Sequence, residues 1–180
     1  MITAPDQYLI DTALELARRS PCRSKRGVVL WDPANGAHRG GGFNGPPTGF
    51  SCPGPELCRR RAVQQETHII QGTCGLRSIH AEMRAIDEAR GYIARHHPPG
   101  PYDLLHVELA PDGGVVACDG PACAQCSKHI VECGFVARVW LYVANPLRDE
   151  RMPDAFRPAW LSYDIAEFHR LSLIANGAAQ

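Results

Sequence analysis

The chain has 180 residues and a formal net charge of zero, with 44% hydrophobic and 21% charged residues. This composition is typical of one soluble globular domain with a full core, and it argues against a protein that grips long stretches of nucleic acid, because phosphate neutralisation needs a basic surplus. Residues 1–8 carry no signal-peptide pattern and no apolar run approaches a membrane span, so we expect a cytoplasmic protein whose eight cysteines are metal ligands or buried thiols.

The first predicted element is an amphipathic helix from Asp6 to Arg19, with Asp6 as its N-cap. A β-hairpin is expected next, because the apolar run 27–31 is followed by turn residues at 32–36 and a returning strand at about 37–43. Three successive glycines at 40–42 weaken that second strand and indicate a bulge or a close backbone approach. Residues 43–50 then form a rigid loop with two glycines and two prolines.

Residues 51–77 are the least regular part of the chain, and we expect a loop insertion there. A long loop inside a compact domain is usually functional or tied down, and a second, structural zinc would tie it down. The candidate ligands are Cys22, Cys52 and Cys74, with Cys58 or His68 as the fourth. Their spacing matches no short zinc motif, so buried or free thiols remain an equally good interpretation.

The rest of the chain alternates helices and strands. A helix is expected from Ile79 to about residue 94, a strand at 104–110, and a short strand or a continuation of it at 115–118. A helix ending at about Cys133, a strong strand at 136–143 and a terminal helix at 165–174 follow. We therefore predict a single α/β domain over residues 1–180, with three α/β/α layers and a central mixed sheet of about five strands.

Two short motifs carry the chemistry. His80 and Glu82 form an H-x-E motif, and Cys123 and Cys126 form a C-x-x-C motif shortly after Pro121. One histidine and two cysteines make a three-ligand zinc site with a fourth position for water, which is the arrangement of a catalytic zinc. Glu82 is not needed as a ligand and is free to move protons.

The spacing of the motifs has a physical reason. If each motif opens a helix, the two cysteines lie one turn apart on one face, and the positive ends of the helices favour thiolates. A lone C-x-x-C is also typical of a redox pair, and a lone H-x-E of an exposed helix face. Both together, about 40 residues apart, come close to the signature of zinc deaminases.

On these residues the chain resembles the deoxycytidylate (dCMP) deaminase family, within the cytidine deaminase-like zinc enzymes. The resemblance runs from about Tyr8 to Asn145 and includes the loop 42–49, which is similar to the family's G-[YF]-N-G-x-P-x-G segment. It implies substrate contacts at Asn44, Gly45, Ala81, Pro121 and Tyr142, and it favours the second zinc, which many members carry. It also implies a homo-oligomer, from dimer to hexamer, with dCTP and dTTP as effectors.

Three departures bear on the substrate and leave the zinc ligands intact. Ala122 stands between Pro121 and Cys123, Arg84 stands where the family commonly has asparagine, and residues 119–120 replace the usual passage into the proline. A phosphate needs cations or backbone amides. The available cations are Arg23, Lys25, Arg26, Arg59, Arg60, Arg61 and Arg84, and the sequence does not choose among them.

The sequence thus predicts a zinc-dependent hydrolytic deaminase of a free deoxycytidine nucleotide, converting dCMP to dUMP and ammonia. Zinc-activated water would attack C4 of the base, with Glu82 as the proton shuttle. The alternatives are deamination of another free base, nucleoside or modified nucleotide, or of cytosine in single-stranded nucleic acid. Zero net charge and an aromatic content of 7% count against a polynucleotide. A non-catalytic, zinc-stabilised binding module is the alternative from a different class.

Overall fold

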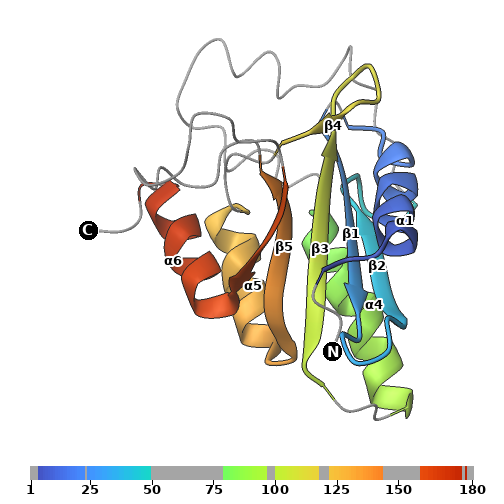
Figure 1. Cartoon of the computed structure of the whole chain (residues 1–180). Coiled ribbons are helices and arrows are strands. Elements are labelled where there is room, and N and C mark those ends of the chain that lie inside the picture. Colours follow the sequence, from blue (N-terminus) through green and yellow to red (C-terminus); the bar gives the residue numbers. More distant parts are fainter. Residues whose placement is uncertain are drawn as a thin grey trace.

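The computed structural model of the chain describes residues 4–22, 24–49, 79–96, 100–117, 122–143, 159–175 and 177. The predicted loop insertion at 51–77 lies outside these residues. Figure 1 shows a central sheet between two helical layers, with α1 (Gln7–Arg18) on one face and α4 (Ala81–His96) and α5 (Ala124–Cys133) on the other. The last helix, α6 (Ile165–Ala175), packs beside α5. The predicted α/β/α layers are confirmed.

The sheet is mixed, as predicted. Its strands are β1 (Lys25–Trp31), β2 (His38–Phe43), β3 (Tyr102–Leu109), β4 (Val115–Val116), β5 (Val136–Val143) and β6 (Ala159–Asp164). They lie in the order β2-β1-β3-β5-β6, with the short β4 paired to the end of β3. β3 and β5 are parallel, and the other neighbours are antiparallel. The predicted hairpin is the β1–β2 pair, whereas β6 follows a charged, proline-containing stretch and was not anticipated.

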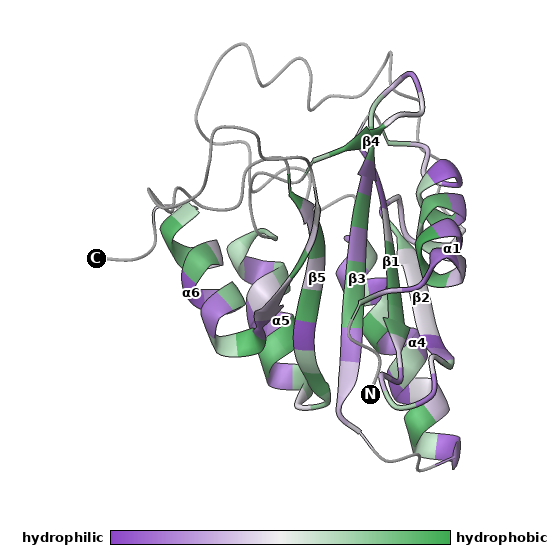
Figure 2. Cartoon of the chain, viewed as in Figure 1, coloured by the Kyte–Doolittle hydropathy of each residue, from purple (hydrophilic) through white to green (hydrophobic). Residues whose placement is uncertain are grey.

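The two faces of the sheet bury separate apolar clusters. Val28 and Leu104 face α4 and α5, whereas Val29 and Leu105, one residue further along the same strands, face α1. This alternation is the two-residue period of a β-strand. The central strands are buried on both faces, and Figure 2 accordingly shows them mostly in hydrophobic green.

The helix ends follow local rules. Asp6 caps α1 as predicted, its carboxylate accepting the backbone N–H of Leu9 at 2.9 Å. α5 ends at Gly134, whose φ of 76° is the left-handed conformation that glycine adopts at little cost. α4 begins at Ala81, two residues later than predicted, because Ile79 forms an antiparallel β-bridge with Gly45. Among the described residues, none of the helices combines the length and the hydropathy that a membrane span requires.

Glycines let α4 lie directly on β2. A Cβ atom at Gly42 would stand 2.7 Å from the backbone nitrogen of Ala85 and closer still to the carbonyl oxygen of Ala81. One at Gly40 would stand 2.5 Å from the carbonyl oxygen of Ala85. The glycine run therefore marks a close backbone approach, as predicted. This approach fixes the position of the first turn of α4, and with it that of His80, which directly precedes the helix.

Candidate active site

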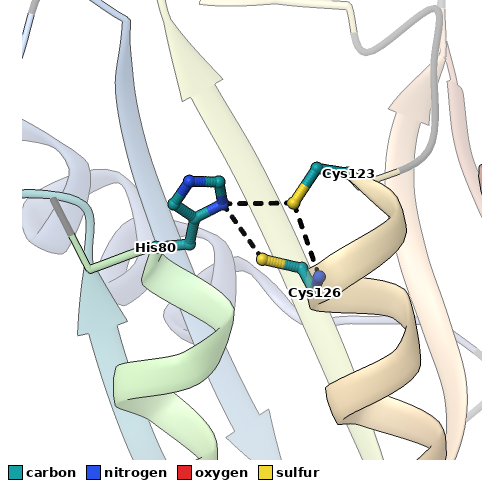
Figure 3. Close-up of side chains that lie close together, drawn as sticks. All are labelled: His80, Cys123 and Cys126. Carbon is teal, nitrogen blue, oxygen red and sulfur yellow. Dashed lines mark hydrogen bonds between the residues drawn. The ribbon is translucent and has the colours of Figure 1, made fainter. Parts of the chain in front are cut away.

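Three potential metal ligands converge where α4 and α5 begin (Figure 3). His80 immediately precedes α4, Cys123 is the N-cap of α5, and Cys126 lies in the first turn of α5. The Nδ1 atom of His80 lies 3.0 Å from the sulfur of Cys126 and 3.4 Å from that of Cys123. The structure thus brings together the three residues that the two motifs predict.

Local backbone structure fixes these side chains. The backbone N–H of Cys126 donates to the sulfur of Cys123 at 3.4 Å, so the cysteine that caps the helix also presents its sulfur to the site. On the other side, Ile79 and Gly45 exchange backbone hydrogen bonds of 2.8 and 3.1 Å, which hold the residue before His80. Each ligand is therefore held by a helix start or a β-bridge.

The pKa values of the two cysteines are shifted in opposite directions. The hydrogen bond with Cys126 lowers the pKa of the Cys123 thiol to about 4, with His80 and a backbone N–H adding to the effect against the influence of burial. The hydrogen bond with Cys123, together with burial, raises the pKa of Cys126. The hydrogen bond with Cys123 also raises the pKa of His80. The three ligand groups are therefore coupled, and the thiolate form is favoured at Cys123.

This donor set fits zinc. Catalytic zinc sites take three protein ligands of nitrogen, sulfur or oxygen and keep a further position for water. The ligand atoms of the three residues all lie within 4.8 Å of one another, and among the described residues they form the only such group of three or more. Both sulfurs lie at the start of a helix, where the helix dipole favours the thiolates that bind metal.

Glu82 stands next to this group as a buried carboxylate. It lies in the first turn of α4, two residues after His80, and is 3% exposed. Burial acts to raise its pKa, but His106, Arg26, His80 and a backbone hydrogen bond outweigh that effect, so the pKa of Glu82 lies below its ordinary value. Glu82 is also one of the groups that raise the pKa of Cys126. The site thus holds an ionised base that can accept a proton.

Asn44 and Gly45 lie in the loop that borders His80. The side-chain oxygen of Asn44 accepts from the hydroxyl of Ser20 and from the backbone N–H of Arg26, both at 2.8 Å, and its amide nitrogen donates to the carbonyl oxygen of Ser24 at 2.7 Å. The side chain of Asn44 therefore anchors the loop, and one of its amide hydrogens remains for another acceptor.

Tyr142 lies on the far face of the sheet. Its neighbours Leu141 and Val143 belong to the cluster beneath α4 and α5, so the alternation of β5 turns Tyr142 to the opposite side. There its ring packs on Trp160, with the centroids 5.3 Å apart. The structure does not bring Tyr142 to the ligand group, whereas it buries Ala81 against β2 close to it.

The remaining predicted residues are only partly described. Cys22 is half-buried, and its backbone N–H donates to the Ser20 hydroxyl at 3.1 Å. Pro121 and the other candidate ligands of a second zinc lie outside the described residues, namely Cys52, Cys58, His68 and Cys74. The second zinc site stays a prediction.

Two side chains near the site have roles that sequence reasoning missed. Arg84 donates from Nη2 to the carbonyl oxygens of Gly45, at 3.4 Å, and of Pro46, and its guanidinium lies 5.1 Å from the ring centroid of Phe43. It ties the loop to α4. His106 is buried in β3 beneath the site. Its only sequence signal is a histidine at an inward position of a buried strand.

The α/β/α layers and the His-Cys-Cys group at two helix starts are the arrangement of a protein that can bind a metal with the ligands of a catalytic centre. Comparison with protein families agrees with this class. The model described as "Cytidine and deoxycytidylate deaminase zinc-binding region" matches residues 3–143. The chain therefore belongs to the cytidine and deoxycytidylate deaminase family, whose members are zinc-dependent hydrolytic deaminases.

Solved structures similar to the chain include two of the dCMP deaminase from the cyanophage S-TIM5. The apo form is 22% identical with a TM-score of 0.43, covering 72% of this chain and 78% of that one. The complex with dCMP and dUMP is 22% identical with a TM-score of 0.44, covering 72% and 76%. The cytidine deaminase from Burkholderia pseudomallei is 15% identical with a TM-score of 0.48, covering 89% and 93%. A search of curated proteins found no match.

Proposed function

We propose that the protein is a zinc-dependent hydrolytic deaminase of a free deoxycytidine nucleotide, which converts dCMP to dUMP and ammonia. One observation carries this proposal: the ionised, buried Glu82 lies beside the convergent ligand atoms of His80, Cys123 and Cys126. A structural zinc site would more naturally use four protein ligands. A carboxylate of this kind next to three ligands therefore counts against a non-catalytic binding module.

The proposed reaction divides the work between three metal ligands and one proton shuttle. His80, Cys123 and Cys126 would hold the zinc, which when bound activates a water for attack on C4 of the base. Glu82 accepts the proton of that water and delivers it to N3 of the ring. It then takes the proton of the hydroxyl that has added to C4 and passes it to the amine, so that the C=O bond forms, the C–N bond breaks and ammonia leaves. The lowered pKa of Glu82 supports the first of these steps, since only an ionised carboxylate can take the proton.

The loop at residues 43–49, which borders His80, would position the nucleotide. Asn44 and Gly45 are candidates for this role because the bridge from Gly45 to Ile79 joins the loop directly to the metal ligand. Ala81 and Pro121 remain candidates from the resemblance alone. The second zinc, the cytoplasmic location, the homo-oligomer and regulation by dCTP and dTTP are likewise proposals.

The substrate is tested by measuring ammonia release from dCMP, dCTP, deoxycytidine, guanine nucleosides and a single-stranded oligonucleotide. We expect kcat/KM for dCMP to exceed that of every other compound by about tenfold or more; for deoxycytidine, the reason is that a site which recognises a phosphate rejects a ligand that lacks it. A higher value for another compound would refute dCMP as the substrate. Ala122, inserted before Cys123, makes a different free base or nucleoside the second candidate.

The proton shuttle is tested with Glu82→Gln, and Glu132→Gln on the exposed side of α5 is the matched control. The first variant should keep its zinc and lose nearly all turnover, while the second should behave as the wild type. Equal activity of the two variants would exclude Glu82 from the reaction.

A further inference from the structure

His106 is a buried polar residue that the proposed reaction does not use. It lies in the middle of β3 and is 2% exposed. Its Nε2 atom is buried and has no hydrogen-bond partner among the described residues. Buried polar atoms are nearly always paired with protein or water, so an unpaired ring nitrogen beneath an active site calls for a functional explanation.

The register of the sheet places His106 under the site. Gly42 of β2 pairs with Val28 of β1, Val28 pairs with His106, and His106 pairs with Leu141 of β5. These residues therefore form one row across the sheet. Val28 and Leu141 face α4 and α5, so His106 faces the same side.

The helices that carry the site stand at the two ends of this row. The first turn of α4, which holds Glu82, rests on Gly42. Cys126 of α5 belongs to the same buried cluster as Leu141. His106 thus lies between the two helix starts, at the floor of the candidate active site.

The electrostatics link His106 to Glu82. Burial lowers the pKa of His106, although Glu82 acts to raise it, so the imidazole is neutral near pH 7. The two groups interact electrostatically when both are charged, so they lie within reach of one another. A neutral imidazole has one N–H donor and one acceptor nitrogen. His106 is not a fourth metal ligand, because it is not in the group of ligand atoms that lie within 4.8 Å of one another.

We propose that His106 is a positioning residue for Glu82, and that its Nε2–H, through one buried water, holds the Glu82 carboxylate toward the three metal ligands. A single water can satisfy an imidazole N–H and a carboxylate oxygen together, and buried waters typically bridge such groups. The inference rests on the proposed function, since Glu82 needs a fixed orientation only if it transfers protons. Removal of an outer-shell partner of this kind typically lowers activity by about 10–100-fold.

The kinetic test compares His106→Leu with His106→Gln, using the nucleotide that the wild type turns over fastest. His106→Leu should lower kcat by about 10–100-fold with KM and zinc content nearly unchanged. His106→Gln keeps a side-chain N–H and should recover most of the loss. The inference is overturned if His106→Leu retains the wild-type kcat, if His106→Gln is equally slow, or if the loss appears in KM or zinc content instead.

The matched control is His129→Leu. His129 lies on α5, and its Nε2 atom is likewise buried, with no hydrogen-bond partner in the part of the chain that the structure describes; it lies 3.9 Å from the carboxylate of Asp87. Removing it changes a half-buried imidazole with a buried Nε2 atom and leaves Glu82 in place, so kcat should stay at the wild-type value. A loss equal to that of His106→Leu would show a general effect of core disruption and overturn the inference.

A second readout does not depend on turnover. The ring nitrogens of His106 are observed by ¹⁵N NMR in the zinc-loaded wild type and in its Glu82→Gln and Glu132→Gln variants. We expect the Nε2 resonance to shift in Glu82→Gln only, because the carboxylate at the other end of the bridge is replaced. Identical resonances in all three proteins would overturn the positioning role. This readout reports on the contact between His106 and Glu82 even if the protein deaminates no nucleotide. It therefore separates this inference from the proposed function.

Discussion

Gly42→Ala should displace the start of α4, which carries Glu82 and follows directly on His80. The added Cβ would stand 2.7 Å from the nitrogen of Ala85, which is 0.7 Å shorter than the 3.4 Å at which ordinary contact begins, and closer still to the carbonyl of Ala81. These are backbone atoms of α4, so the helix start has to move. Overpacking of this kind costs about 1–3 kcal/mol. A displacement of about 1 Å at a catalytic group can cost about 100-fold in rate.

The assay pairs urea unfolding with steady-state deamination, and Gly27→Ala is the matched control. A Cβ at Gly27 would stand 2.7 Å from the nitrogen of Ala17 in α1, on the opposite face of the sheet, and closer still to the carbonyl oxygen of Ala13. Both variants should lose a similar free energy of unfolding, but only Gly42→Ala should lose about 100-fold in kcat. If the two variants lose activity equally, the argument that β2 positions the catalytic helix is refuted.

Two further predictions concern Arg84 and His106. Arg84→Met removes the two hydrogen bonds to the loop carbonyls, so KM should rise about tenfold with zinc content unchanged; an unchanged KM would contradict a role in holding the loop. His106 has a lowered pKa in the folded protein, so below about pH 6.5 the unfolded chain binds the extra proton and stability falls as the pH falls. The free energy of unfolding should drop by about 1.4 kcal/mol per pH unit until the folded pKa is reached, and urea unfolding of His106→Gln in the same buffers should lack this increment.

The ligand set could be predicted because it depends on short spacing. An H-x-E and a C-x-x-C at helix starts fix the directions of three ligand atoms, and the structure brings those atoms together. The layers followed from the order of apolar runs. The two-residue delay of α4 was not predictable, since it results from the bridge between Gly45 and Ile79, which are far apart in sequence.

The face of a strand is harder to predict than its existence. Alternation shows that Trp140 and Tyr142 share one face of β5, but only packing against β6 and the helices shows which face meets the site. For the same reason, the sequence did not reveal that His106 faces the active site. Its position in a buried strand was clear, whereas its closeness to Glu82 depends on the pairing of three strands.

The most direct test of the account measures zinc content and dCMP turnover in the same samples of the wild type, Glu82→Gln and Cys126→Ser. The account predicts that Glu82→Gln binds as much zinc as the wild type and is inactive, whereas Cys126→Ser has lost one zinc per chain together with its activity. Full zinc content in Cys126→Ser, or substantial turnover in Glu82→Gln, would contradict it.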